Sequence, residues 1–169
     1  MRLPNADLFQ TLPIVLIGEI AITSTLSIAL AAFNAASVGD NSVSFVIGVI
    51  IWTLGEYLCH RFVLHYLAPL RHRVHHTFPS KAPDEFVWQI WICFGMLFWI
   101  IGGTVLAGVL GAYAYYLLIH HCAHQRPDLL PKTLLRHHNS HHKFAKTNYG
   151  VTTTVWDHCF GTIRRCDDP

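Results

Sequence analysis

Apolar side chains occur in long, nearly unbroken runs along this chain, at about residues 13–37, 43–66, 86–101 and 104–121. A helix that rises 1.5 Å per residue needs about 20 apolar residues to cross a hydrocarbon core of about 30 Å. The pattern predicts an all-α integral membrane protein with about four transmembrane helices. Gly102-Gly103 divides the last two runs, so these form either a full helical hairpin or a segment that dips into the membrane and returns.

Polar residues concentrate between and after these runs, at 68–85 and 122–169. Four crossings place both segments on one side of the membrane, where we expect them to form a helical, histidine-rich cap. Nearly all Lys and Arg residues also belong to that side, and neither opposite loop contains one. Short cytoplasmic loops are enriched in Lys and Arg, so the cap is predicted to be cytoplasmic. No linker interrupts residues 1–169, which predicts a single membrane-embedded domain.

Composition agrees with a membrane protein. Charged residues make up 13% of the chain, about half the usual share of about 25% in soluble domains. The formal net charge is only +2, and no basic stripe with interleaved aromatic residues is present. A nucleic-acid partner is therefore not expected.

Histidine is the residue that carries candidate chemistry. The chain has 13 histidines, and imidazole is the commonest metal ligand in proteins. Most lie in four clusters at spacings of three or four residues, which share one face of a helix. The best-spaced positions are His60, His65, His72, His75, His76, His120, His124, His138, His141 and His142. His121, His137 and His158 fall outside this spacing, and we expect supporting or unrelated roles for them.

Ten imidazoles are too many for one metal ion. A structural zinc site uses about four ligands and a catalytic one about three, so ten suit two metals with four or five ligands each. Imidazole ligands favour Zn, Fe, Cu or Ni over Mg, Ca or Mn. His60 and His65 are five residues apart and diverge by about 140° on an ideal α-helix. They therefore address two different metals, or the helix is distorted between them.

Three carboxylates adjoin the clusters and are candidates to hydrogen-bond the ligand histidines: Glu56, Asp84 and Asp157. Glu56 lies one turn before His60 in an apolar helix, where a carboxylate is costly and is usually paired or functional. A carboxylate that accepts a hydrogen bond from the other ring nitrogen of a ligand histidine fixes its tautomer and its orientation. The alternative for Glu56 is a side chain that extends to the membrane interface.

The four clusters together resemble the histidine boxes of the fatty acid hydroxylase/sterol desaturase superfamily of integral-membrane di-iron proteins. The superfamily pattern H-x(3,4)-H, H-x-x-H-H, H-x-x-x-H, H-x-x-H-H is matched in order, with four residues between His60 and His65 in the first box. The segment Asn148-Tyr-Gly-Val151 with Trp156-Asp157 also resembles the sequence that follows the last box. The similarity covers roughly residues 48–163.

This resemblance implies an O2-dependent lipid hydroxylase that contains two iron ions, which zinc could replace in purified protein. The substrate would be an acyl chain or a related lipid. The chain carries no cytochrome b5-like segment, so electrons would come from a separate ferredoxin or cytochrome b5 type donor. Two alternatives stay open: a lipid desaturase or carotenoid-ring hydroxylase with the same chemistry, and a non-enzymatic membrane metal-binding protein.

Overall fold

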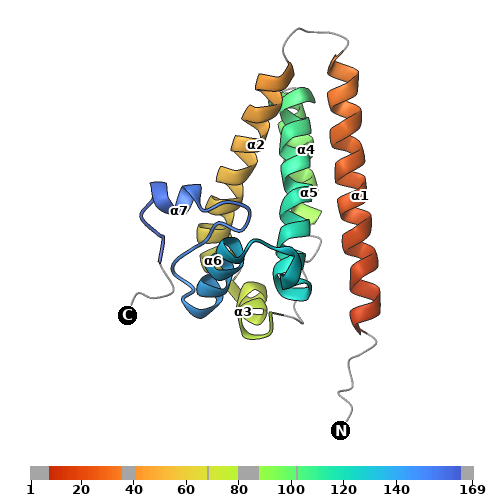
Figure 1. Ribbon diagram of the computed structural model, residues 1–169. Coiled ribbons are helices and arrows are strands. Elements are labelled where there is room, and N and C mark those ends of the chain that lie inside the picture. Colours follow the sequence, from red (N-terminus) through yellow and green to blue (C-terminus); the bar gives the residue numbers. More distant parts are fainter. Residues whose placement is uncertain (1–7, 36–40, 68, 80–87, 102, 165–169) are drawn as a thin grey trace. The chain divides into compact units, whose positions relative to one another are not determined.

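The computed structural model describes residues 8–35, 41–67, 69–79, 88–101 and 103–164. These residues form helices joined by turns, and no strand occurs among them (Figure 1). The helices are α1 (Leu8–Ala35), α2 (Asn41–Leu58), η1 (Cys59–Leu67), α3 (Pro69–Thr77), α4 (Trp88–Ile101), α5 (Gly103–Gln125), η2 (Pro127–Leu129), α6 (Lys132–Lys143) and α7 (Val155–Cys159). The all-α class predicted from the apolar runs is confirmed.

Three helical stretches are long and apolar enough to cross a membrane: Ile14–Phe33, Ser42–Tyr66 and Gly103–Gln125. They correspond to three of the four predicted crossings. The fourth prediction, at 86–101, corresponds to α4, which has 14 residues. At 1.5 Å per residue α4 extends about 21 Å, less than the hydrocarbon thickness of about 30 Å. Among the described residues, α4 therefore fits a segment that enters the membrane better than a full crossing.

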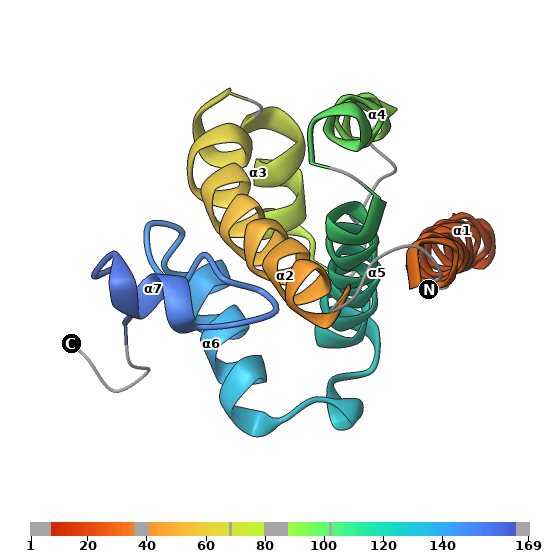
Figure 2. The same cartoon turned by 90° about the horizontal axis from the view of Figure 1, so that it is seen from above.

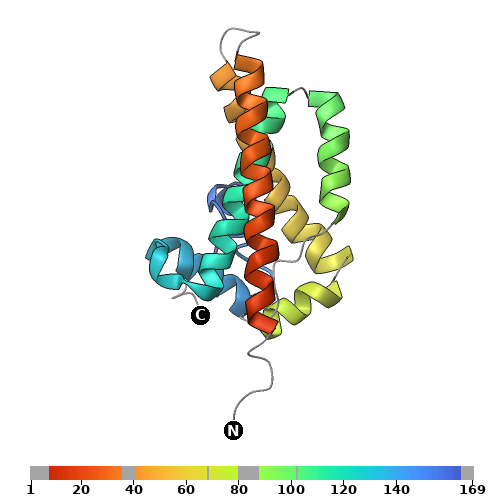
Figure 3. The same cartoon turned by 90° about the vertical axis from the view of Figure 1, so that its right-hand side faces the viewer.

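The chain divides into two compact units, and α2 and α5 contribute to both. The first unit lies within residues 1–52 and 84–117. Helices α4 and α5 are antiparallel neighbours (Figure 3), and the ring centroids of Phe94 and Tyr113 are 5.2 Å apart across them. The core of this unit is apolar and aromatic, consisting of Phe94, Leu106, Val109, Leu110, Tyr113 and Leu117.

Two glycines let α2 and α5 pack backbone against backbone in the first unit. A Cβ atom on Gly48 would lie 2.0 Å from the carbonyl oxygen of Val105, and one on Gly108 would lie 2.1 Å from that of Phe45. Neither position has room for a side chain. Small residues commonly allow such close approach between membrane helices, where van der Waals packing replaces the hydrophobic effect as the main attraction.

Helix α1 lies beside α5 in the same unit (Figure 2), and polar side chains connect the two helices. The Ser27 hydroxyl donates to the carbonyl oxygen of Ala107 at 2.7 Å. The Tyr113 hydroxyl donates to the buried carboxylate of Glu19. Outward-facing residues of α1, such as Ile17, Ile28 and Phe33, are more than 60% exposed in the isolated chain. A helix that buries Glu19, Thr23 and Ser27 and exposes large apolar side chains is suited to a lipid environment.

The second unit lies within residues 53–83 and 118–169 and contains all 13 histidines. Its described elements are the end of α2, η1, α3, the end of α5, α6 and α7. The π-helical segment η1 continues α2 directly. A π-helix bonds residue i to residue i+5 and is frequent at functional sites. Residues five apart therefore come onto nearly the same face, which bears directly on His60 and His65.

Candidate metal centre

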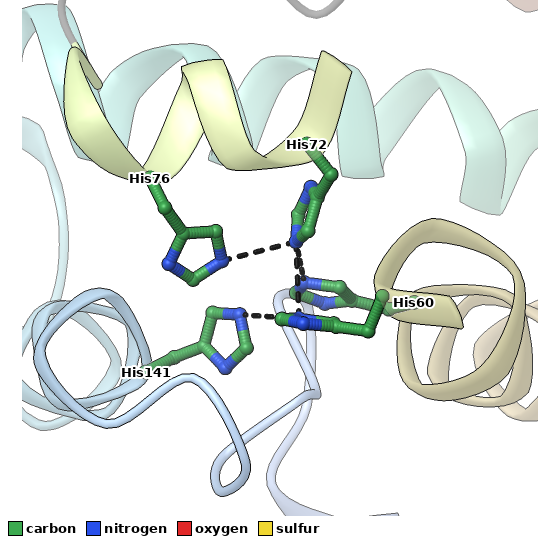
Figure 4. Close-up of side chains that lie close together, drawn as sticks. His60, His72, His76 and His141 are labelled. Carbon is green, nitrogen blue, oxygen red and sulfur yellow. Dashed lines mark hydrogen bonds between the residues drawn. The ribbon is translucent and has the colours of Figure 1, made fainter. Parts of the chain in front are cut away.

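The ten histidines singled out by their spacing come together in the second unit as two groups of five. The first group consists of His60, His65, His72, His76 and His141. The second group consists of His75, His120, His124, His138 and His142. Within each group the ligand atoms all lie within 4.8 Å of one another. Figure 4 shows the rings of His60, His72, His76 and His141 turned toward a common centre.

Each group takes its members from three elements. A helix that belongs to a candidate membrane span supplies two histidines: η1 supplies His60 and His65, and α5 supplies His120 and His124. The remaining members come from α3 and α6, which contribute to both groups. Consequently neither group can form until helices distant in sequence have packed together.

The two H-x-x-H-H clusters are each divided between the groups. On α3, His72 and His76 enter the first group while His75 enters the second. On α6 the pair His138 and His142 enters the second group and His141 the first. Residues four apart differ by only about 40° around a helix, whereas the middle histidine of each cluster is rotated by about 60° or 100° from them. In each cluster the pair therefore faces one centre and the middle histidine faces the other centre.

The two alternatives for His60 and His65 are decided by η1. Both residues belong to the first group, so they do not address two different centres. The helix is distorted between them, because residues 59–67 form a π-helix. The wider turn compensates for the five-residue spacing that would separate the two rings on an α-helix.

Neighbouring Nε2 atoms lie at the separation expected of ligands to one metal ion. In the first group the contacts run from 3.0 to 3.3 Å, and in the second from 3.0 to 3.2 Å. Imidazole nitrogens bind zinc at about 2.0–2.1 Å, so two ligands at 90–110° are about 2.8–3.4 Å apart. The spacing of the imidazole nitrogens in both groups therefore fits a metal ion at each centre.

Hydrogen bonding among the imidazoles does not account for this arrangement. His72 Nε2 lies 3.0 Å from His60 Nε2, 3.1 Å from His65 Nε2 and 3.0 Å from His76 Nε2. A ring nitrogen offers either one hydrogen or one lone pair, so it cannot satisfy three such contacts at once. Several lone pairs directed at one point are the donor set of a cation.

The outer nitrogens of two first-group rings indicate which nitrogen is left for a metal. His60 Nδ1 lies 2.5 Å from the carbonyl oxygen of Tyr149, and His141 Nδ1 lies 2.7 Å from that of Thr147. A carbonyl oxygen can only accept, so both Nδ1 atoms carry the hydrogen and donate it. In the neutral ring, Nε2 then presents a bare lone pair to the centre of the group.

The surroundings keep these imidazoles neutral. Burial, reinforced by the rings of His76 and His65, lowers the pKa of His72 to about 2. Burial lowers the pKa of His141 to about 3, although the hydrogen bond to Thr147 opposes the shift. Burial and neighbouring rings also hold the pKa of His138 well below its usual value. Because a metal binds the deprotonated ring, the groups are ready to bind cations at neutral pH.

The two groups adjoin. The ring centroids of His76 and His142, one from each group, are 4.6 Å apart, and those of His75 and His76 are 6.2 Å apart. Two cations held by these groups would be neighbours rather than independent sites. Paired metal ions that share a substrate are a common catalytic arrangement.

The two candidate carboxylates that the structure describes accept hydrogen bonds from backbone nitrogens rather than from the ten histidines. Glu56 accepts hydrogen bonds from the backbone nitrogens of Val151 and Thr152. Asp157 accepts from the backbone nitrogens of Tyr149 and Gly150 and from His137 Nε2. Asp84 lies outside the described residues. The prediction of a direct bond from Glu56 to a ligand histidine is thus replaced by a connection through the segment 149–152.

Sequence reasoning missed the backbone carbonyls of Thr147 and Tyr149, because a carbonyl leaves no side-chain signature. The only available signal was the family-like segment beginning at Asn148. The three histidines that fall outside the best spacing also stand outside both groups. Of these, His137 is buried against Asp157, and His158 is exposed with Nδ1 bonded to the carbonyl oxygen of Thr154.

The family profile and several similar curated proteins all indicate the same family. The fatty acid hydroxylase family profile matches residues 45–162. A fatty acid 2-hydroxylase from Macaca fascicularis is 32% identical over 146 residues, covering 70% of this chain and 39% of the relative. A dihydroceramide fatty acyl 2-hydroxylase from Arabidopsis thaliana is 31% identical over 138 residues, covering 69% and 58%.

A third relative is the ceramide very long chain fatty acid hydroxylase of Saccharomyces cerevisiae. It is 30% identical over 151 residues, which cover 74% of this chain and 39% of the relative. The chain thus spans about two fifths to three fifths of the length of these curated relatives. No solved structure matches it.

Proposed function

Because the chain belongs to the fatty acid hydroxylase family, we propose that it is a membrane oxidoreductase that uses O2 to hydroxylate the acyl chain of a lipid. The observation that carries this proposal is the pair of adjoining five-histidine groups. The relatives are named as 2-hydroxylases of fatty acids and of dihydroceramide acyl chains. We therefore expect oxidation near the carboxyl or amide end of an acyl chain rather than at its tail.

Two iron ions are the proposed cofactors, one in each group. The first would be held by His60, His65, His72, His76 and His141, and the second by His75, His120, His124, His138 and His142. All-imidazole sites also suit zinc, which could occupy them in purified protein. When bound, the iron pair supplies the O2 and electron-transfer chemistry that amino-acid side chains lack.

The chain's own residues prepare the site for that chemistry. The carbonyl oxygens of Tyr149 and Thr147 hold a hydrogen on Nδ1 of His60 and of His141, so Nε2 stays unprotonated. Burial of His141 and His138 excludes water from part of the inner surface of both groups, since these side chains are at most 2% exposed. Hydrogen-bonded partners of this kind fix the tautomer and the orientation of a ligand histidine, so they would hold the geometry while substrate and O2 arrive.

A lipid substrate is supported by the helices that carry the histidines. His60 and His65 belong to the candidate span Ser42–Tyr66. The same stretch exposes Phe62, at 48%, and Tyr66, at 63%. Exposed apolar side chains on a membrane helix contact lipid, so an acyl chain and the ligand histidines would share one helix. This favours a lipid over a water-soluble substrate.

Hydroxylation of a C–H bond by O2 consumes two electrons and two protons and releases one water for each hydroxyl formed. We propose that a separate ferredoxin or cytochrome b5 type protein donates the electrons. The excess of Lys and Arg around the histidine segments supports a cytoplasmic location for that face. Residues 1–169 would act as one membrane-embedded catalytic domain.

Expression in a lipid-producing host, followed by mass spectrometry of extracted lipids, tests the activity. Hydroxylation adds one oxygen atom to a product and desaturation removes two hydrogen atoms. We expect oxygen addition, abolished by His141→Ala and by His142→Ala, one from each group. The matched control is His158→Ala, an exposed histidine outside both groups, which should retain activity.

Metal analysis separates the enzyme from its alternatives. The purified chain should hold two metal ions, and each single ligand variant should lose about one. Two bound metals with unaltered lipids in the presence of a suitable donor would favour a metal-binding protein. Fewer than two metals, with product formation unaffected by His141→Ala, would refute the two-metal enzyme.

A further inference from the structure

Four consecutive backbone N–H groups in the second unit point at two carboxylates. Tyr149 N and Gly150 N donate to Asp157 Oδ1 and Oδ2, both at 2.8 Å. Val151 N and Thr152 N donate to Glu56 Oε1 at 2.7 and 3.0 Å. The Thr152 hydroxyl adds a bond of 2.6 Å to Glu56 Oε2. We refer to Glu56 and Asp157 as the carboxylate clamp and to residues 149–152 as the clamped segment.

Both carboxylates are buried, with 5% exposure for Glu56 and none for Asp157. A buried carboxylate is costly unless it is fully hydrogen-bonded. Here the donors are backbone groups of an irregular segment, which has no helix or strand partners of its own. Several hydrogen bonds to each carboxyl group offset this cost. The clamp therefore holds in place a segment that forms neither helix nor strand.

Tyr149, the first residue of the clamped segment, contacts the first histidine group. The carbonyl oxygen of Tyr149 accepts from His60 Nδ1 at 2.5 Å. The Tyr149 ring is buried against the same group, with centroids 5.8, 5.4 and 5.5 Å from those of His60, His65 and His141. A displacement of this segment would release the Nδ1 partner and the packing surface of His60 together.

Gly150 allows the two carboxylates to act on adjacent residues. A Cβ atom there would lie 2.0 Å from the carbonyl oxygen of Thr153 and 3.0 Å from Asp157 Oδ2. The tight turn therefore requires a residue without a side chain. It brings the N–H groups of Tyr149 and Gly150 to Asp157 and those of the next two residues to Glu56.

We propose that Glu56 and Asp157 are positioning residues that act through the Tyr149 carbonyl to hold His60, and with it the first histidine group, in metal-binding geometry. This inference rests on the proposed function, because it assumes that the group binds a metal. Partners of this type that orient ligand histidines typically change metal affinity by about 10–100-fold when they are removed. The effect should be confined mainly to the first group.

The test measures iron(II) affinity of the full chain under anaerobic conditions, by competition with a chromophoric chelator and by elemental analysis. Two parent variants isolate the groups: His142→Ala leaves the first group intact, and His60→Ala leaves the second. Glu56→Ala in the His142→Ala parent should weaken iron binding by about 10–100-fold. In the His60→Ala parent the same change should alter affinity by less than about threefold, because the clamped segment contacts His60 and the first group rather than the remaining second group.

Conservative variants separate positioning from charge, since Glu56 also interacts electrostatically with His120 of the second group. Glu56→Gln keeps one oxygen that can accept from Val151 N and Thr152 N, so it should retain most first-group affinity. Asp157→Asn places an amide NH2 against N–H donors on one side, so it should weaken that affinity as Glu56→Ala does. Asp128→Ala is the matched control, because this carboxylate is exposed and pairs locally with Arg126.

Each remaining outcome refutes the inference. Unchanged first-group affinity in Glu56→Ala and Asp157→Asn would show that the clamp does not position His60. Equal losses in both parents would indicate general support of the fold. Equal impairment by Glu56→Gln and Glu56→Ala would assign the effect to the charge near His120. If the unaltered chain binds no iron, the proposed function itself fails, and this inference fails with it.

Discussion

The backbone contact between α2 and α5 makes a clear stability prediction for Gly48→Ala. The added Cβ would lie 2.0 Å from the carbonyl oxygen of Val105, whereas a close carbon–oxygen contact is about 3.3 Å. The helices must therefore separate locally by about 1.3 Å, and the obstacle is backbone that cannot rotate away. Overpacking of this kind costs about 1–3 kcal/mol.

The matched control is Gly55→Ala, on the same helix, where an added Cβ would have no atom within 4 Å. Both variants gain about 0.5–1 kcal/mol from the lower backbone entropy of alanine in the unfolded chain. That gain cancels in the comparison, so Gly48→Ala should be less stable than Gly55→Ala by about 1–3 kcal/mol. Gly108→Ala should behave like Gly48→Ala, because its Cβ would lie 2.1 Å from the carbonyl oxygen of Phe45.

Reversible unfolding in mixed detergent micelles, followed by loss of helical circular dichroism, measures this difference. The double variant Gly48→Ala with Gly108→Ala should cost less than the sum of the two, because separation of the helices relieves both contacts. Equal midpoints for Gly48→Ala and Gly55→Ala would refute the close packing of α2 against α5.

Three further predictions concern polar groups and the clamped segment. Metal-free protein should lose stability as the pH falls below about 6.5. The pKa of His72 is about 2 and that of His141 about 3 in the folded protein, so over this range only the unfolded chain takes up protons on these two rings. The free energy of unfolding should then fall by about 1.4 kcal/mol per pH unit for each histidine. Unfolding curves that do not change between pH 7 and 5 would contradict this. Gly150→Ala should cost about 1–3 kcal/mol and lower iron content, measured by elemental analysis with Gly55→Ala as control. Ser27→Ala should cost only about 0.6 kcal/mol in the same unfolding assay, the average for hydrogen bonds between membrane helices.

The sequence alone determined the helical membrane class and the ten candidate histidines. Apolar runs identify α1, α2 and α5 because a hydrocarbon core requires long uninterrupted apolar helices. Spacings of three and four residues select His72, His75, His76, His138, His141 and His142 because helical periodicity is a local property. Exclusion of His137 also followed from spacing, and its bond to Asp157 gives that histidine another role.

The division of the histidines into two groups depended on the tertiary structure. Spacing could not separate His75 from His72 and His76, because the rings of α3 face two centres only when histidines of η1 lie at one and histidines of α5 at the other. The π-helical turn at His60 and His65 was likewise revealed only by the structure, since the five-residue spacing left two alternatives open.

The connection from Glu56 to His60 also could not be predicted from the sequence. It joins residues 95 positions apart at Val151 and passes through backbone N–H and carbonyl groups that nearly every residue possesses. Local sequence specified which side chains could bind metal, because chemical type and helical spacing are written in the residues themselves. Tertiary structure specified which rings share a centre and what holds them, because those depend on where distant backbone segments come to lie.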